Sequence, residues 1–177
     1  HPHLISVLAY AVRKAPRYVV MPWLEGATLA AALAGGRMDP PRAFWIARQV
    51  AEALTALASA GWMHGDVKPG NIFLSREGHV TLLDLGFARR IDRREPAAPR
   101  CVAGTCHYMA PEAMSRGLPV DMRSDIYSLG VVLFEMLAGR RPFDGQDAAE
   151  IARRHREEPV PDLAQFAADL PAEAGLL

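Results

Sequence analysis

The sequence predicts an α+β domain with short strands early in the chain and long helices after them. Two short apolar runs rich in β-forming residues, 4–9 and 17–21, lie close together near the N-terminus. Apolar residues then recur at helical spacing between positions 46 and 57. Residues 124–137 are strongly apolar, which is typical of a helix buried on nearly all sides.

Boundary residues support the early elements of this assignment. Residues 13–16 contain a lysine and a proline and predict a turn that joins the two strands. A short helix is expected over residues 28–33, because Gly35 and Gly36 follow as a stop. Asp39 is a good N-cap for the long helix, and two prolines occupy its first turn.

The second half of the chain follows the same logic. Residues 71–74 and 79–83 flank an Arg-Glu-Gly turn and predict a small hairpin. Residues 88–100 carry charges and prolines without periodicity, which indicates a loop. Residues 147–156 predict an amphipathic helix with one charged face.

Composition narrows the class of protein. The 177 residues suffice for one domain with a core, and a formal net charge of +0 argues against nucleic acid or an anionic membrane as partner. No apolar run is long enough to span a bilayer, and the first residues do not resemble a signal peptide. Cys101 and Cys106 form no disulfide framework, so we expect a cytoplasmic setting. A longer parent protein could still be anchored in a membrane.

One pair of motifs carries recognisable chemistry. Residues 64–71 read His-Gly-Asp-Val-Lys-Pro-Gly-Asn, and Asp84-Leu85-Gly86 follows. Asp66 can accept a proton from an incoming hydroxyl, and Asn71 with Asp84 can hold Mg²⁺ against phosphate oxygens. A buried, hydrogen-bonded histidine is the simpler interpretation of His64 alone. It leaves Lys68, Asn71 and Asp84 unexplained, so the motifs favour phosphoryl transfer.

Together these residues resemble eukaryotic-type Ser/Thr protein kinases of the bacterial style. The family signature has a catalytic loop, a metal motif and an Ala-Pro-Glu motif, which appear here in that order at 64–71, 84–86 and 110–112. Residues 104–109, 124–130 and 141–143 also resemble the family. The resemblance covers nearly the whole chain.

The resemblance implies a protein kinase-like fold that is truncated at both ends. Residues 1–25 would be the end of the small lobe, with two strands and the hinge. Residues 26–177 would be the mostly helical large lobe without its last helices. The implied activity is transfer of the ATP γ-phosphate to Ser or Thr of protein substrates, with Mg²⁺ as the metal and Mn²⁺ as a possible substitute.

The resemblance also implies roles in catalysis. Asp66 would be the base, and Lys68 would neutralise charge on the γ-phosphate. Asn71 and Asp84 would bind the metal. Thr105 would hydrogen-bond near Asp66 and Lys68, and it favours Ser/Thr over Tyr as the acceptor.

A second set of roles concerns ATP. Met21 would be the gatekeeper, and the hinge from Pro22 to Leu24 would face adenine. Pro22 has no N–H, so Leu24 would supply the hinge donor. Phe73 would form the floor beneath adenine. Plain core packing is an equally good interpretation of Met21 and Phe73 from the sequence.

Departures from the family pattern are informative. Gly65 replaces the arginine that usually clamps a phosphate on the activation loop, and residues 87–104 contain no Ser, Thr or Tyr. We therefore expect a non-RD kinase whose loop is not switched by its own phosphorylation. No Gly-x-Gly occurs, Lys14 lies in the wrong place for the ATP-binding lysine, and no arginine follows Arg156 to pair with Glu112. A fragment that is inactive alone explains these absences.

Two alternatives remain open. A pseudokinase or interaction scaffold would not need the lysine and the glycine-rich loop, although it would not need Asp66, Asn71 and Asp84 either. A small-molecule phosphotransferase of the aminoglycoside type also carries His-Gly-Asp and a downstream Asn. Residues 104–112 resemble a peptide-substrate platform and count against it. The substrate, regulatory domains, oligomeric state and role of the cysteines are not determined by the sequence.

Overall fold

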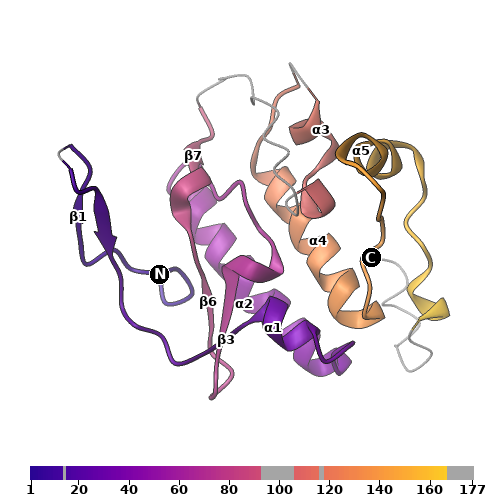
Figure 1. Ribbon diagram of the computed structural model, residues 1–177, viewed down its shortest axis with the longest axis horizontal. Coiled ribbons are helices and arrows are strands. Elements are labelled where there is room, and N and C mark those ends of the chain that lie inside the picture. The colour runs from indigo at the N-terminus through magenta and orange to yellow at the C-terminus, as the bar shows by residue number, and fades with distance from the viewer. Residues whose placement is uncertain (14, 93–105, 116–117, 167–177) are drawn as a thin grey trace.

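The computed structural model describes residues 1–13, 15–92, 106–115 and 118–166, and it confirms the α+β class (Figure 1). The helices are α1 (Leu29–Leu33), α2 (Pro40–Ser59), α3 (Pro111–Met114), α4 (Met122–Ala138) and α5 (Ala148–Glu157). The strands are β1 (Ala9–Ala11), β2 (Tyr18–Val20), β3 (Gly26–Thr28), β4 (Trp62–Met63), β5 (Ile72–Ser75), β6 (Val80–Leu82) and β7 (Arg89–Arg90). Four 3₁₀ turns are η1 (Pro69–Asn71), η2 (Leu85–Phe87), η3 (Cys106–Tyr108) and η4 (Leu163–Gln165).

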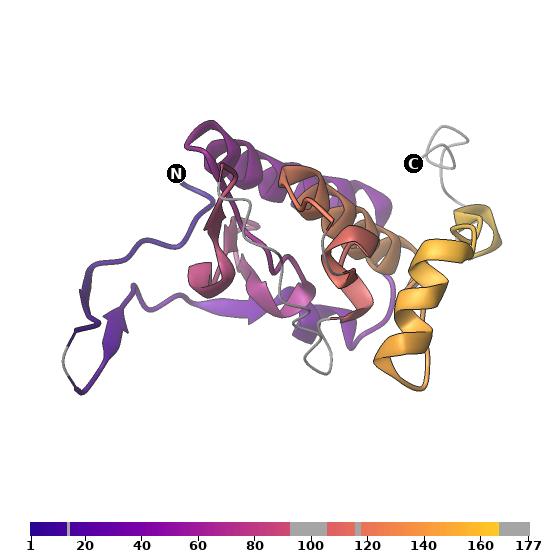
Figure 2. The same cartoon turned by 90° about the horizontal axis from the view of Figure 1, so that it is seen from above.

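The two long helices, α2 and α4, lie side by side and contribute most of the core (Figures 1 and 2). Val50 of α2 and Val132 of α4 are completely buried, as are Ile72 and Leu82 from the adjoining sheet. Apolar burial of this kind is the main stabilising contribution to a domain. The helices and this sheet therefore form one continuous core beneath the catalytic loop.

A three-stranded antiparallel sheet has the strand order β3-β5-β6. The predicted metal ligands flank it in the sequence, with Asn71 directly before β5 and Asp84 shortly after β6. Thr28 lies opposite Phe73, and Ile72 lies opposite Leu82. The predicted hairpin is thus confirmed as β5–β6, while β3 was not anticipated. A second small ladder pairs β4 with β7, which places Met63 opposite Arg89.

Side-chain caps begin the helices that the sequence predicted. The Thr28 hydroxyl accepts from the N–H of Ala31 at 3.2 Å, and Asp147 caps α5 in the same way. Asp121 caps α4 two residues earlier than predicted. Asp39 is the N-cap of α2, but its side chain makes no capping bond.

The N-terminal hairpin differs from its prediction in position. Its first strand is Ala9–Ala11 and not residues 4–9, and it pairs with Tyr18–Val20. Leu4 instead bridges Leu82 at the edge of the sheet. The hairpin extends away from the helices in both views (Figures 1 and 2). Its apolar side chains are consequently exposed.

Helix α4 is also less enclosed than its apolar sequence predicted. Ile126 is 49% exposed, and Met122, just before the predicted range, is 41% exposed, whereas Val132 and Met136 are fully buried. Within the described parts of the chain, no helix is both long enough and apolar enough to cross a membrane. Most of the predicted loop over 88–100 lies outside the described residues, and its described beginning forms β7.

Candidate active site

The catalytic loop, residues 64–71, connects β4 to β5, and Asp125 of α4 is hydrogen-bonded to its backbone. The chain leaves β4 at Met63, turns through Gly65, and enters the 3₁₀ turn at Pro69. Asp66 and Asn71 are buried although both are polar. Buried polar groups need hydrogen-bond partners, and this loop supplies them internally.

Asp66 has the densest set of polar contacts in the loop. The Lys68 ammonium lies 3.0 Å from Asp66 Oδ1 and 2.8 Å from Oδ2. Asn71 Nδ2 donates to Asp66 Oδ2 and to the Asp66 carbonyl oxygen, both at 2.8 Å. The structure thus brings three of the predicted catalytic residues together around one carboxylate.

His64 links this loop to the strand before Asp84. The Asp66 N–H donates to His64 Nδ1 at 3.2 Å, so Nδ1 is the unprotonated nitrogen. His64 Nε2 therefore carries the proton and donates to the Leu83 carbonyl at 2.9 Å. The Leu83 N–H in turn donates to the Asn71 carbonyl at 2.7 Å. The carbonyl and the N–H of Leu83 are thus both hydrogen-bonded to the loop, which holds the adjacent Asp84 near Asn71.

Asn71 and Asp84 carry the oxygens that could hold a divalent cation. Because the Asn71 side chain makes both of its hydrogen bonds to described residues through Nδ2, its amide oxygen remains available as a ligand. Asp84 stands in the left-handed region at φ 59°, and its Oδ1 accepts from the Gly86 N–H at 2.9 Å. Among the described residues no group of three or more His, Cys, Asp or Glu could hold a metal. One carboxylate and one amide suit Mg²⁺, which takes its other ligands from phosphate and water.

Asp125 of α4 fixes the backbone at the centre of the loop. Its Oδ2 accepts from the His64 N–H at 2.7 Å and its Oδ1 from the Gly65 N–H at 2.8 Å. Burial raises the pKa of Asp125, while the Gly65 and His64 amides and the nearby Arg89 guanidinium oppose that rise. The family resemblance also implies that Asp125 caps this loop from the central helix, and both contacts agree with that role.

Gly65 occupies a position where a side chain would be strained. Its φ is +78°, and a Cβ at this position would lie 2.9 Å from the Phe87 carbonyl oxygen. Left-handed backbone disfavours residues other than glycine, and the close oxygen adds a steric cost. The glycine that departs from the family pattern therefore matches the local geometry.

The residues predicted to contact ATP lie in two places: Met21, Pro22 and Leu24 between β2 and β3, and Phe73 on β5. Met21 and Pro22 are exposed, and Leu24 is half-buried just before β3. Phe73 lies on β5 two residues after Asn71 and opposite Thr28. In the register of β3 with β5, Gly26 lies opposite Ser75 and Thr28 opposite Phe73, so the hinge joins β3 at the end farther from Asn71.

Several other predicted residues have different outcomes. Thr105 and Cys101 lie outside the described residues, and Cys106 is buried. Glu112 has no late arginine but accepts a 2.5 Å hydrogen bond from the Ser124 hydroxyl. His155 is buried.

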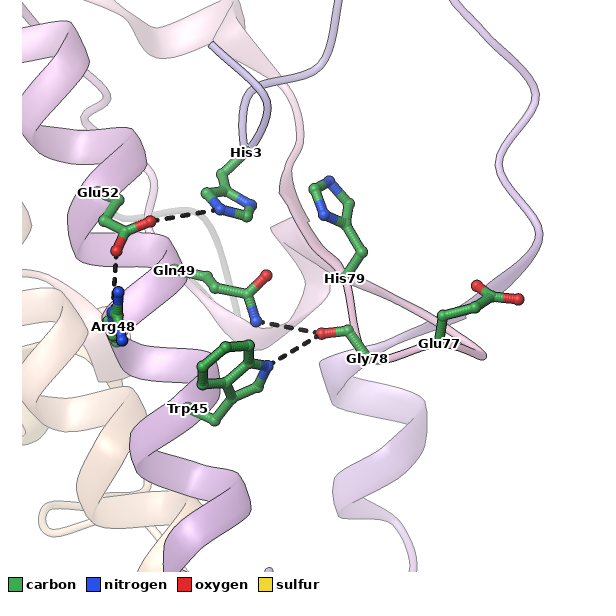
Figure 3. Close-up of a pocket in the computed structure, with 8 residues that line it drawn as sticks. All are labelled: His3, Trp45, Arg48, Gln49, Glu52, Glu77, Gly78 and His79. Atoms are coloured by element: carbon green, nitrogen blue, oxygen red, sulfur yellow. Dashed lines mark hydrogen bonds and ion pairs between the residues drawn. The ribbon is translucent and has the colours of Figure 1, made fainter.

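Hydrogen bonds between α2 and the β5–β6 turn were not predicted from the sequence. Gln49 donates to the Gly78 carbonyl at 3.1 Å and accepts from the Val80 N–H at 3.0 Å, and Trp45 also donates to Gly78 (Figure 3). These groups line a cavity of about 310 Å³ between α2 and the β5–β6 turn. Their bonds to one another hold the turn on the helix. A glutamine inside an apolar period was the only sequence signal.

Comparisons with known proteins agree with this geometry. The model of the protein kinase domain family matches residues 1–173. The chain is 34% identical to serine/threonine-protein kinase PrkC of Bacillus subtilis, over 97% of this chain and 26% of that protein. It is 37% identical to serine/threonine-protein kinase PknB of Mycobacterium tuberculosis, over 97% of this chain and 29% of that protein. Against PknB of Mycobacterium leprae, identity is 42% over 81% of this chain and 24% of that protein. The chain spans roughly a quarter of the length of these relatives. It belongs to the protein kinase domain family.

Proposed function

We propose that this chain supplies the base and the metal ligands of a serine/threonine protein kinase that transfers the γ-phosphate of ATP to protein substrates. The observation that supports this proposal is the hydrogen-bonded set around Asp66, with Lys68 and Asn71 on its carboxylate. Phosphoryl transfer needs positioning and charge stabilisation more than covalent chemistry, and this set offers both. We assign residues 1–25 to the end of the small lobe and residues 26–177 to the large lobe.

In the proposed reaction the acceptor hydroxyl gives its proton to Asp66 as its oxygen attacks the γ-phosphorus and the bond to ADP breaks. Lys68 neutralises charge on the γ-phosphate oxygens, and its contact with Asp66 keeps it beside the reacting group. Asn71 and Asp84 would hold Mg²⁺, which would neutralise charge on the phosphates. Mn²⁺ has the same preference for oxygen ligands.

The remaining assignments follow from the family pattern. Met21, Pro22, Leu24 and Phe73 would contact adenine, and Thr105 with Lys68 would favour Ser or Thr as the acceptor. We also propose a location in the cytoplasm.

Because residue 65 is glycine, no arginine stands there to bind an activating phosphate, and we propose a non-RD kinase. Mass spectrometry of the active protein should find no stoichiometric phosphate between Asp84 and Glu112. A stoichiometric activating phosphate there would contradict this point.

Phosphotransfer assays on the complete gene product that contains these residues test the proposal. With Mg·ATP and a generic protein substrate, Asp66→Asn should lower the rate by about 10²–10⁴-fold, the usual contribution of a general base. Asp92→Asn is the matched control, because Asp92 is an exposed partner of Arg90. An inactive wild-type protein that still binds a protein partner would favour the scaffold alternative. We expect the isolated 177 residues to show no phosphotransfer.

A further inference from the structure

An arginine beyond Asp84-Leu85-Gly86 reaches the structure that supports the catalytic loop. Arg89 lies on β7, opposite Met63 of β4, and Met63 directly precedes His64. Its Nε donates to Met63 Sδ at 3.1 Å. Arg89 is therefore attached to the residue from which the catalytic loop starts.

The other end of the guanidinium contacts the start of α4. An Arg89 terminal nitrogen donates to the Val120 carbonyl oxygen at 3.4 Å. Val120 precedes Asp121, the N-cap of the helix that carries Asp125. One side chain thus connects the β4–β7 ladder to the helix that holds the loop amides.

Charge provides a third link between Arg89 and the loop. A buried carboxylate is costly unless opposite charge or hydrogen bonds compensate it. Asp125 is 4% exposed, and the groups that favour its charged form are the amides of Gly65 and His64, the His64 ring and the Arg89 guanidinium. His64 is neutral in the tautomer described above, whereas an arginine keeps its charge at every working pH. Arg89 is consequently the permanent cation among these described partners.

We propose that Arg89 is a positioning residue for phosphoryl transfer, because its guanidinium compensates the buried charge of Asp125 and ties β7 to the start of α4. The His64 and Gly65 amides then remain bound to Asp125, and Asp66 remains in place. Since position 65 has no side chain, the positive charge reaches the loop from the segment after Asp84. A displacement of β7 would move the Arg89 charge away from the loop.

Amide NMR of the 177-residue chain tests this inference directly. The His64 and Gly65 amide protons bind the Asp125 carboxylate, so their shifts across a pH series report its titration. Arg89→Met should raise the shared midpoint by about one pH unit, because a neighbouring opposite charge is lost. Arg90→Met is the matched control: Arg90 is the adjacent arginine and pairs with exposed Asp92, so its midpoint should equal that of the wild type.

Arg89→Lys separates charge from geometry, since it keeps the cation but loses the planar guanidinium. Its midpoint should lie between those of the wild type and Arg89→Met. Equal midpoints in Arg89→Met and Arg90→Met would overturn the inference. If Arg89→Met does not fold, Arg89→Gln removes the same charge, and a wild-type midpoint in that variant would overturn the inference as well.

A kinetic measurement adds the functional consequence, which rests on the proposed kinase function. In the complete gene product, Arg89→Met should lower kcat about tenfold and leave KM for ATP unchanged, because the base is misplaced while the nucleotide still binds. The amide titration does not require catalysis. Failure of the proposed function and failure of the Arg89 inference are therefore distinguishable.

Discussion

The catalytic loop and the β1–β2 hairpin are both short irregular parts of the chain, yet they are held in opposite ways. In the loop, His64 and Asp66 are buried, and they bond to Asp125 and Leu83 from two other segments and to Lys68 within the loop. In the hairpin, backbone pairing joins Ala9–Ala11 to Tyr18–Val20 while Tyr10 is 69% exposed. Figure 2 shows the hairpin extending away from the helices that surround the loop.

The difference shows that backbone pairing and fixed position are separate properties. A two-stranded hairpin without a packed face is marginal in water. A loop without regular pairing can be rigid when its peptide groups bond to buried side chains, because breaking such bonds leaves unsatisfied polar groups. The proposed base and metal ligands therefore depend for their positions on α4 and on Leu83, directly after β6, and the hairpin contributes little to them.

Removing the negative charge of Asp125 should weaken the loop most. Asp125→Asn replaces a carboxylate that accepts two amide bonds with a group that can accept only one side of the pair. We expect a loss of about 1.5–3 kcal/mol in the free energy of unfolding. Urea denaturation measures it, with Asp92→Asn on the surface as control. Equal stabilities of the two variants would contradict the role of Asp125.

Adding a methyl group at Gly65 should have the next largest effect. Gly65→Ala forces a Cβ to within 2.9 Å of the Phe87 carbonyl oxygen at a φ of +78°. Gly78→Ala has a similar φ of +85° with no atom within 4 Å, so it shares only the backbone strain. Each variant should lose about 1–2 kcal/mol from the left-handed backbone, with a further loss for Gly65→Ala. If the Gly65 variant lost no more than the Gly78 variant, the close oxygen would have no role.

Acid should weaken the region where α5 packs beside α4. Burial lowers the pKa of His155 to about 4, although the His107 carbonyl opposes the shift. Burial and the nearby Glu112 charge raise the pKa of Tyr127 to about 12, so its hydroxyl stays protonated and donates to His155 Nδ1 at 2.6 Å. His155 Nε2 is then a buried group without a hydrogen-bond partner among the described residues.

The stability from keeping His155 neutral should be complete above its unfolded pKa near 6.5 and lost as the pH falls towards about 4. This direction follows because the unfolded chain binds the proton first. The thermal midpoint of His155→Gln should therefore fall less between pH 6.5 and 4 than that of the wild type. His79→Gln, at an exposed position, should keep the wild-type slope. Identical slopes for all three proteins would refute the prediction.

Substitutions in the hairpin should have the smallest effect. Tyr10→Ser and Val19→Thr remove apolar surface that is already largely exposed, so each should change the free energy of unfolding by less than about 0.5 kcal/mol. Chemical denaturation of both variants measures this. A loss comparable to that of Asp125→Asn would show that the hairpin packs on the core and would break the comparison.

The sequence predicted the parts of the fold that local pattern determines. Helical spacing and caps predicted α2 and α5, and a turn between β-rich runs predicted β5–β6. The position of β1 and the exposed face of α4 depend on which surfaces lie opposite one another, and composition does not contain that information. For the same reason the apolar run 4–9 was assigned as a strand, whereas Leu4 only bridges Leu82.

The candidate site shows the same division. Motif spacing predicted Asp66, Lys68, Asn71 and Asp84, because those residues are close in the chain and chemically specific. The contribution of Arg89 could not be predicted, since its contacts with Met63 and Val120 are 26 and 31 residues distant in sequence. Gln49 was hidden for a similar reason, as its partners lie in the β5–β6 turn.

Hydrogen exchange of the 177-residue chain tests most directly whether the base and metal ligands are held by α4 and β6 without the hairpin. We expect the amides of His64, Gly65, Asp66 and Leu83 to exchange much more slowly than those of β1 and β2, because their acceptors are buried. A chain with Tyr10→Ser and Val19→Thr should keep this protection. Equally fast exchange in the loop and the hairpin, or loss of loop protection in the hairpin variant, would contradict it.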